Sequence, residues 1–301
     1  EATLTGGALR DAIDRFAPQG VVGATAYGAA LAARLMPRSP VPRDGDAVPY
    51  WADVFGDLMA EAQAKAAAHG SDLSVVRFWT TLRAVLERGD RFSAVSHAQA
   101  SALVGQLGLA GRLSSATAGQ DLVSVIPCAG ELRREAVPDP VVRGRRVPPD
   151  AFVVLWSGSF NTWCDVDTLV EGVEGAMERR ESIHFVATGG GVAGHDERTI
   201  ARFAGLVARS RFRDRFLIDG WVRDDLLPAY YEEADVGVCI ERDLYERRLG
   251  AENRVVQWLV HGLPCVTTGL SELGRALVGE GACFSTTTGD ADALAAVLVD
   301  L

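Results

Sequence analysis

Lysine is almost absent from this sequence of 301 residues. Lys65 is the only lysine, and the other 29 of the 30 basic residues are arginines. A phosphate-binding loop of the GK[ST] type needs a lysine directly after a glycine, so that class of nucleotidase is excluded. Schiff-base chemistry would have to use Lys65, which lies in an alanine-rich run, 62–68, that reads as an ordinary helix.

Cysteines are few, and long apolar runs are missing. The five cysteines are widely spaced and none forms a CxxC pair, which argues against a zinc ribbon and a redox motif. Reduced cysteines suit a cytoplasmic protein. No apolar run approaches the ~20 residues that cross a bilayer, and no signal peptide is visible. Because the sequence starts at Glu1 without a methionine, we expect that its natural start is missing.

The composition is that of a folded globular protein. It is 48% hydrophobic and 23% charged, with a mean hydropathy of +0.09, which allows a sizeable core. The length suggests two domains. Forty acidic residues against 30 basic ones argue against a nucleic-acid partner, whose binding surface would be basic.

The clearest boundary is a segment rich in proline and arginine, residues 137–150, which has no hydrophobic periodicity. It divides the sequence into an N-terminal domain, 1–142, a linker, 143–150, and a C-terminal domain, 151–301.

The second half alternates short apolar runs with amphipathic segments. Val166, Leu169, Val170, Val173 and Met177 lie on one helical face, and Asp165 is placed to cap that helix. Strands that are apolar throughout and alternate with helices indicate a parallel sheet covered on both faces. The strands are expected at 152–156, 183–187, 216–218, 236–240 and 264–267.

The first half shows the same alternation less clearly. Strands are expected near 21–23, 48–52, 92–95 and 122–126, with helices near 7–16, 24–34, 57–68, 74–88 and 97–107. The predicted fold class is therefore α/β, with two Rossmann-like doubly wound domains facing a central cleft. Such folds bind ligands at the carboxyl ends of their strands.

A glycine-rich turn, TGGGVAG, follows the second strand of the C-terminal domain. Gly189, Gly191 and Gly194 match GxGxxG, the dinucleotide-binding pattern. The match stands after the second strand rather than the first, and Asp219 comes late for the ribose-binding acid. The alternative is a turn where a ligand approaches the backbone closely.

A second cluster lies at residues 251–269. A helix is predicted from Glu252 to His261, ended by Gly262, and its first turn offers free amides and a positive dipole end. Arg254 lies on that turn, with Arg247 and Arg248 nearby. Arginines there can bind a diphosphate through two hydrogen bonds, or they can form a solvated face.

These segments resemble the donor-binding domain of a GT-B glycosyltransferase, most closely the retaining family 4. The similarity rests on the strand and loop at 155–161, on FLIDGWVRDDLLPAYYEEADVGVCI at 216–240, and on Asn253-Arg254, Gln257-Trp258 and Gly262-Leu263-Pro264. It spans about 151–301. By this resemblance both ends are truncated, because a strand should precede Val21 and a helix should follow Leu301.

The resemblance implies a nucleotide-diphosphate sugar as donor, with no metal or other cofactor. The base would lie near Trp221, the diphosphate near the first glycine turn and Asn253, and the ribose near Gln257. Three features depart from the family. The Arg and Lys that follow the first strand of the donor domain and hold the diphosphate are replaced by residues 161–164. The ribose-binding glutamate is matched by Gln257, which can bond hydroxyls but carries no charge, and its partner glutamate aligns with Leu249, so that Glu246 or Glu252 would have to substitute through a gap. The predicted donor-binding residues are Gly158, Asn161, Trp163, Gly190, Gly191, Trp221, Val222, Asn253 and Gln257.

The predicted catalytic residues are His195, Arg254 and Glu246. His195 would bond the donor sugar or leaving phosphate, or else belong to a helix cap. In the N-terminal domain, Asp53 or Asp57 would contact an acceptor hydroxyl or act as a base, and capping is the alternative for Asp57. The five histidines are too scattered to indicate a metal site.

We therefore predict a glycosyltransferase that moves a sugar from a nucleotide-diphosphate sugar to an unknown acceptor, with retention. The acceptor could be a saccharide, a lipid-linked molecule or a small molecule, and peripheral membrane contact stays open. The alternatives are an NAD(P)-dependent oxidoreductase that uses the GxGxxG turn, a non-catalytic nucleotide-sugar-binding protein, and an epimerase of the same fold.

Overall fold

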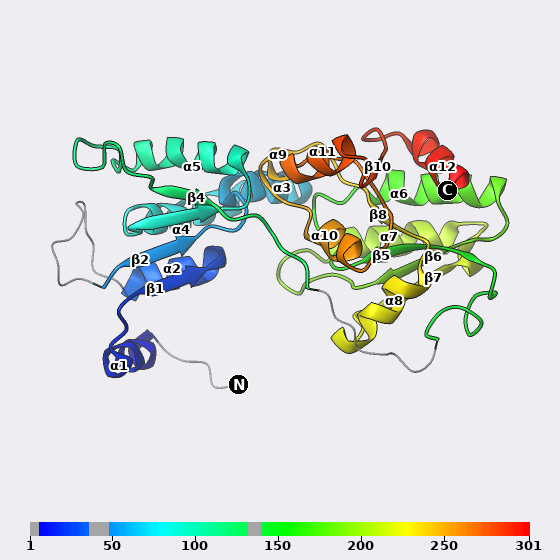
Figure 1. Cartoon of the computed structure of the whole chain (residues 1–301), viewed down its shortest axis with the longest axis horizontal. Helices are drawn as coiled ribbons and strands as arrows, with labels where there is room; N and C mark the ends of the chain where they lie inside the picture. Colours follow the sequence, from blue (N-terminus) through cyan, green and yellow to red (C-terminus); the bar gives the residue numbers. More distant parts are fainter. Residues whose placement is uncertain (1–5, 36–47, 132–139) are drawn as a thin grey trace. The chain divides into compact units, whose positions relative to one another are not determined.

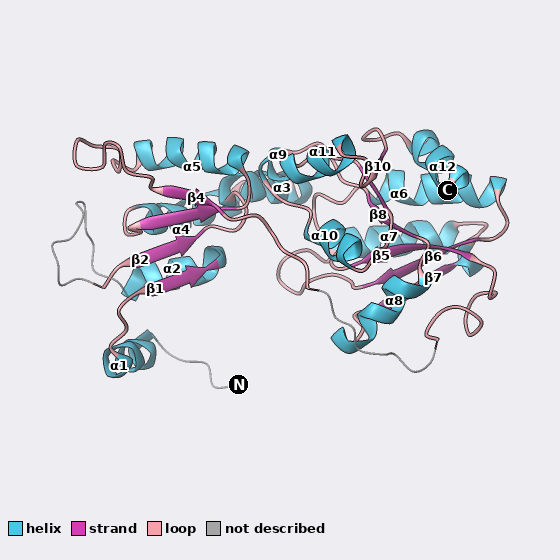
Figure 2. Ribbon diagram, viewed as in Figure 1, coloured by secondary structure: helices cyan, strands magenta, loops and turns pink. Residues whose placement is uncertain are grey.

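The structure is a computed structural model that describes residues 6–35, 48–131 and 140–301. The chain divides into two compact units, Glu1–Pro127 and Cys128–Leu301, called unit 1 and unit 2 below. Each unit is a parallel β-sheet with packed helices (Figures 1 and 2). The α/β fold with Rossmann-like sheets that the sequence predicts is confirmed.

Unit 1 contains a four-stranded parallel sheet in the order β1-β2-β3-β4. The helices that connect the strands fall close to the predicted ranges. Gly70, with a φ of +65°, ends α3 in the left-handed conformation. The elements are α1 (Gly6–Phe16), β1 (Val21–Ala24), α2 (Thr25–Leu35), β2 (Tyr50–Asp53), α3 (Leu58–His69), α4 (Leu73–Leu86), β3 (Arg91–Ala94), α5 (His97–Leu109) and β4 (Val123–Val125).

One face of this sheet carries the core of unit 1. Consecutive parallel strands joined by right-handed crossovers place the connecting helices on the same side. Tyr50 and Ala52 of β2 are fully buried there, in a cluster with residues of α2, α4 and α5. Trp51, between them, faces the other side and is 38% exposed.

Unit 2 contains a six-stranded parallel sheet in the order β10-β9-β8-β5-β6-β7. The order reverses direction at β5, since β6 and β7 lie on one side of it and β8, β9 and β10 on the other. The carboxyl ends of β5 and β8 flank this topological switch point, where open α/β sheets bind ligands.

The five strands that the sequence predicts for the C-terminal half are present in unit 2, whereas the short last strand was not predicted. The elements of unit 2 are β5 (Phe152–Ser157), α6 (Val166–Arg179), β6 (Ile183–Thr188), α7 (Arg198–Arg209), η1 (Arg213–Arg215), β7 (Phe216–Gly220), η2 (Asp224–Leu226), α8 (Leu227–Glu233), β8 (Val236–Cys239), α9 (Tyr245–Leu249), α10 (Asn253–Val260), β9 (Cys265–Thr267), α11 (Glu272–Gly279), β10 (Phe284–Ser285) and α12 (Ala291–Asp300).

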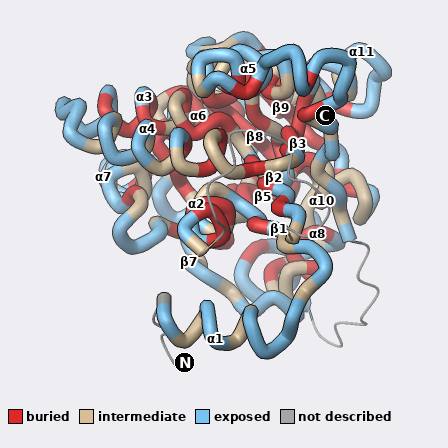
Figure 3. The backbone as a smooth tube through the Cα atoms, turned by 90° about the vertical axis from the view of Figure 1, so that its left-hand side faces the viewer, coloured by how far each residue is buried: buried red, intermediate tan, exposed pale blue. Residues whose placement is uncertain are grey.

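Helices cover both faces of the sheet in unit 2. Val154 and Trp156 of β5 belong to a core that includes α6, α7 and α12, whereas Val153 and Leu155 belong to a second core with α8 and α10. Alternate residues of β5 therefore pack into the cores on opposite faces of the sheet. Buried residues concentrate on the strands and inner helix faces (Figure 3).

Residues 143–150, predicted as a linker, lie within unit 2, because the division falls after Pro127. The backbone amides of Val141, Val142 and Arg143 donate to the carboxylate of Glu233 at 2.7–2.8 Å. Val142 and Val147 are buried against the sheet. The prolines end regular structure here, yet the two valines and the carboxylate hold the segment in place.

Candidate functional site

The candidate site lies at the carboxyl edge of the sheet in unit 2, around the switch point. After β5 the chain turns at Gly158, whose φ of +99° favours glycine. The next strand along the sheet, β8, ends before Ile240 and Glu241, and α10, which begins at Asn253, packs against β8 and β9. We call this region the switch-point site.

Arg254, on the first turn of α10, contacts β5 and the loop that follows it. Its guanidinium lies over the ring of Trp156, with Cζ 4.2 Å from the centroid, and Nη2 donates to the carbonyl of Ser159 at 3.0 Å. A Cβ on Gly158 would be 3.9 Å from the same guanidinium. The other terminal nitrogen, Nη1, is buried and bonds to none of the described residues. A buried guanidinium nitrogen with a vacant donor is suited to an anion.

Besides Gly158, the loop after β5 contains two of the predicted donor-binding residues, Asn161 and Trp163. Asn161 is buried and its Nδ2 donates to the hydroxyl of Ser159 at 2.8 Å, while its Oδ1 has no partner among the described residues. The ring of Trp163 packs against His195 at 6.2 Å between centroids and against the guanidinium of Arg247 at 4.6 Å. The structure thus places Trp163 and His195 side by side.

A buried cluster of charges follows β8. Arg247 forms an ion pair with Glu241 at 3.0 Å and another with Glu246. Burial raises the pKa of the Glu241 carboxyl to about 7, although the charge of Arg247 opposes that rise. Burial disfavours the charge of Arg247, but the two carboxylates outweigh it and raise its pKa.

Sequence reasoning missed Glu241 as a member of this cluster. The available signal was the first of three charged residues, Glu241-Arg242-Asp243, directly after the apolar strand 236–240, at the edge where ligands bind. Its Oε2 is buried and has no partner among the described residues. Arg248, grouped with Arg247 and Arg254 in the sequence, instead lies on the surface and pairs with Asp243 at 2.6 Å.

Glu252 fixes the start of α10. It is buried, and its carboxylate accepts hydrogen bonds from the hydroxyls of Thr267 at 2.6 Å and Ser271 at 2.9 Å. Ser271 also caps α11 by accepting from the amide of Gly274. This arrangement ties the first turns of two helices to β9 and so orients Arg254, two residues further along.

The glycine turn after β6 packs against the loop after β5. Gly189 has a φ of +106°, and a Cβ at this position would lie 2.1 Å from the carbonyl oxygen of Gly158. The amide of Phe160 donates to the carbonyl of Gly190 at 3.0 Å, and the indole nitrogen of Trp221 donates to that of Gly191 at 3.1 Å. These glycines therefore allow two loops to meet.

The run of Gly194, His195 and Asp196 caps α7 through Asp196 rather than through the His195 ring. The side chain of Asp196 accepts from the amides of Arg198 and Thr199 at 2.9 and 3.2 Å, so it performs that capping role. This leaves His195 beside Trp163 at the edge of the switch-point site.

Gln257 lines a separate cavity of about 240 Å³ in unit 2. Its side chain exchanges two hydrogen bonds with the backbone of Glu131, at 2.7 and 3.1 Å. His261, one turn further along α10, and Asp224 also face the cavity.

Two further predicted donor-binding residues lie outside this cavity. Val222 is partly buried and packs against the core cluster that includes residues of α8. Asn253, by contrast, is exposed at the first position of α10.

Both acidic candidates in unit 1 accept hydrogen bonds from other residues of the same unit. The hydroxyl of Ser93 donates to Asp53 at 2.5 Å. Asp57 is buried and caps α3 by accepting from the amides of Met59 and Ala60 at 3.1 and 2.8 Å. Its other oxygen accepts from Gln106 at 2.9 Å.

The described residues contain no group of three or more His, Cys, Asp or Glu side chains arranged to hold a metal ion. Within the same parts of the chain, no helix has the length and apolar character needed to cross a membrane.

Comparison with known proteins defines the class. The chain resembles sucrose-phosphate synthase from Thermosynechococcus elongatus over 97% of its own length and 66% of that protein, with a TM-score of 0.71 and 18% identity. The Anabaena protein HepE, in complex with UDP and glucose, gives a TM-score of 0.66 at 16% identity, over 96% of this chain and 70% of HepE. A trehalose-phosphate synthase from Burkholderia xenovorans gives 0.67 at 14% identity, over 98% and 69% of the two chains.

The fold is thus that of the GT-B glycosyltransferases. The family model "Glycosyl transferases group 1" matches residues 151–301, half of the chain, and the chain belongs to that family. It spans just under two thirds of the length of the sucrose-phosphate synthase. No curated protein sequence matches it.

Proposed function

We propose that this protein transfers a sugar from a nucleotide-diphosphate sugar to an acceptor hydroxyl, with retention at the anomeric carbon. The observation that carries this proposal is the buried Nη1 of Arg254, which has no partner among the described residues and lies beside the Gly158 turn at the start of α10. Family membership supports the same reaction.

In the proposed complex the diphosphate lies between the Gly158 turn and the first turn of α10. The helix N-terminus and Arg254 stabilise the negative charge that develops as the bond between the sugar and the phosphate breaks. The acceptor oxygen forms the new bond to the anomeric carbon, and its proton passes to the departing phosphate. These groups provide positive charge from the protein itself, so we propose a reaction without a metal cofactor.

We place the nucleoside at the cavity beside Gln257, whose carboxamide can bond ribose hydroxyls. A uridine nucleotide is the first candidate, because HepE was seen with UDP and glucose. The trehalose-phosphate synthase was seen with glucose-6-phosphate, which makes a sugar phosphate the first acceptor to test. The five free cysteines support a reducing, cytoplasmic location.

One observation favours a second candidate, a protein that binds a nucleotide sugar without transferring it. The Arg/Lys pair that follows the first donor-domain strand in family 4 is replaced here by residues 161–164, which carry no charge. The loss of two cations would weaken stabilisation of the leaving group more than binding of the nucleoside.

A thermal-shift panel of UDP, GDP, ADP, dTDP, uridine and NAD⁺ tests the proposal. We expect one diphosphate to raise the Tm, because a ligand that binds only the folded state stabilises it, and uridine to act more weakly. The corresponding nucleotide sugar should then be hydrolysed or transferred. If only NAD⁺ raised the Tm, the oxidoreductase alternative would replace this proposal. Binding without turnover would favour the non-catalytic candidate.

A further inference from the structure

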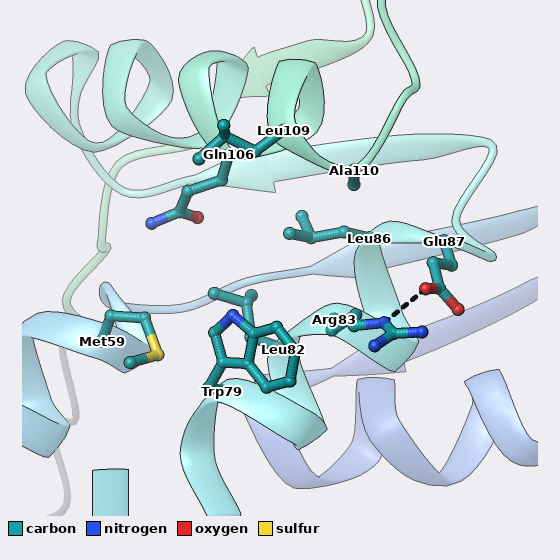
Figure 4. A pocket seen from close by; sticks show the side chains of 9 residues that line it. All are labelled: Met59, Trp79, Leu82, Arg83, Leu86, Glu87, Gln106, Leu109 and Ala110. Atoms are coloured by element: carbon teal, nitrogen blue, oxygen red, sulfur yellow. Dashed lines mark hydrogen bonds and ion pairs between the residues drawn. The ribbon is translucent and has the colours of Figure 1, made fainter. Parts of the chain in front are cut away.

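Unit 1 contains a pocket of about 490 Å³ that the proposed reaction does not use. It lies between α4 and α5, with the start of α3 at one end (Figure 4). The volume is in the range of small-molecule sites, which are mostly apolar with a few placed polar groups. Six apolar residues line the pocket: Met59, Trp79, Leu82, Leu86, Leu109 and Ala110.

The wall formed by α4 is largely apolar. Trp79 is 50% exposed, although tryptophan is normally well buried. Leu82 and Leu86, on the same helix, are held in place because they belong to the packed core of unit 1, and they form the inner surface of the pocket. An aromatic ring placed against Trp79 would remove apolar surface from water on both partners.

Gln106 supplies one hydrogen-bond acceptor of fixed orientation. Its Nε2 donates to Oδ2 of Asp57 at 2.9 Å, and Asp57 is itself held as the cap of α3. A carboxylate only accepts, so the amide nitrogen must face Asp57 and the amide oxygen must face away from it. In Figure 4 the Gln106 amide projects from α5 into the pocket, opposite Trp79.

The charged residues at the other end of the pocket neutralise each other. Nε of Arg83 lies 2.6 Å from Oε1 of Glu87, one helical turn away. The guanidinium of Arg83 also lies 5.4 Å from the centroid of the Trp79 ring. Because the pair carries no net charge, this end of the pocket offers a charged ligand no opposite charge that is not already paired, whereas the apolar walls suit a neutral ligand.

We propose that this pocket binds a neutral, ring-containing small molecule that stacks on Trp79 and donates one hydrogen bond to Oε1 of Gln106. This inference goes beyond the proposed glycosyl transfer, since it concerns unit 1 alone and needs no nucleotide.

Two fluorescent probes with the same ring system test the proposal. N-phenylnaphthylamine is neutral and has one N–H group, and anilinonaphthalene sulfonate adds a negative charge to the same skeleton. In titrations of the full chain, we expect saturable binding of the neutral probe with one site per chain, and at least ~10-fold weaker binding of the sulfonate. Equal affinities, or no saturable binding of the neutral probe, would overturn the proposal.

Variants assign the binding to this pocket. Ala110→Phe fills it from the end of α5 and should abolish binding, and Gln106→Leu should weaken it at least ~5-fold by removing the acceptor. Leu73→Ala is the matched control, because Leu73 lies on α4 outside the pocket and is 88% exposed. Circular dichroism checks that each variant is folded. Unchanged affinity for the neutral probe in both folded pocket variants would refute the assignment. If Ala110→Phe does not fold, the affinity of Gln106→Leu alone tests it, and an unchanged value would refute the assignment.

Discussion

The guanidinium of Arg254 lies over the indole of Trp156, with Cζ 4.2 Å from the ring centroid, at the point where β5 ends and α10 begins. Trp156 is fully buried, so it gives the guanidinium a rigid apolar support. The carbonyl of Ser159 accepts a hydrogen bond from one terminal nitrogen, which leaves the other for a ligand. An arginine held in this way needs little reordering when an anion binds.

Substitution of Arg254 should therefore weaken nucleotide-diphosphate binding specifically. We expect Arg254→Lys to raise the Kd about 10-fold to 100-fold, since lysine keeps the charge but loses the planar fork and the stacking on Trp156. Arg254→Gln should raise it further. Titration calorimetry with the diphosphate that stabilises the wild-type protein measures both effects.

The control for this prediction is Arg248→Gln. Arg248 is close in sequence to the site, but it is exposed and paired with Asp243. Its replacement should leave the Kd within about twofold. Comparable losses in the Arg248 and Arg254 variants would indicate a general effect of charge on the approach of the ligand rather than a specific site.

Glu241 should make the stability of the protein depend on pH. The ordinary pKa of its carboxyl is 4.5, and in the folded protein burial raises that pKa to about 7. Between these values the folded state keeps a proton that the unfolded state has released. The free energy of unfolding therefore falls as pH rises from about 4.5 to about 7 and then levels off.

Glu241→Gln should remove this dependence. We expect the wild-type protein to lose on the order of 2–3 kcal/mol relative to the variant between about pH 5 and pH 8, measured by urea unfolding. Glu178→Gln is the control, because Glu178 forms an exposed pair with Arg211 and should not alter the pH profile. Parallel pH profiles for wild-type and Glu241→Gln proteins would contradict the assigned pKa shift.

The segments at the switch point could be predicted from sequence because their signals are local. The apolar spacing from Val166 to Met177 predicts α6, and Gly262 marks the end of the helix that begins near Asn253. The position of Arg254 on the first turn follows from the same pattern. Each prediction depends on residues within one or two helical turns of each other.

The contacts that complete the site could not be predicted in this way. The stacking of Arg254 on Trp156 joins residues 98 positions apart (254 minus 156), and only the order of strands in the sheet brings them together. The role of Glu252 likewise requires Thr267 and Ser271. Residues 143–150 read as a linker because their prolines are visible in the sequence, whereas Glu233, which holds this segment, is about 90 residues away.

Gly189→Ala should disrupt the meeting of the two loops at the switch-point site. The new Cβ would lie 2.1 Å from the carbonyl oxygen of Gly158, and backbone on both sides would have to move. We expect a loss of several kcal/mol in the free energy of unfolding, on the order of 3 kcal/mol, together with weaker diphosphate binding.

Gly194→Ala is the control that distinguishes the steric clash at position 189 from the strain of placing alanine at a positive φ. Gly194 also has a positive φ, +73°, but a Cβ there would meet nothing within 4 Å. Its replacement should cost only about 1 kcal/mol in urea unfolding. Equal losses in the two variants would show that close approach of the loops is not the reason for glycine at position 189.

Cys265 and Cys283 should form a disulfide when the protein is oxidised. They stand opposite each other next to the paired residues of β9 and β10, and their sulfur atoms are 3.0 Å apart. The hydrogen bond with Cys265 lowers the pKa of the Cys283 thiol, which favours the reactive thiolate. Diamide accepts the two hydrogen atoms that the thiols release as the S–S bond forms.

Mass spectrometry after diamide treatment should show a loss of about 2 Da per chain and a linked peptide pair, since each S–S bond removes two hydrogen atoms. The closed loop should raise the free energy of unfolding by roughly 2–3 kcal/mol, because it restricts the unfolded chain. Cys265→Ser should abolish the link, and Cys128→Ser should not, since the thiol of Cys128 is not paired with that of Cys265 or Cys283. Cross-links only between chains would mean that the buried pair is closed to the oxidant, and an unchanged stability after complete linkage would mean that the bond strains the edge of the sheet.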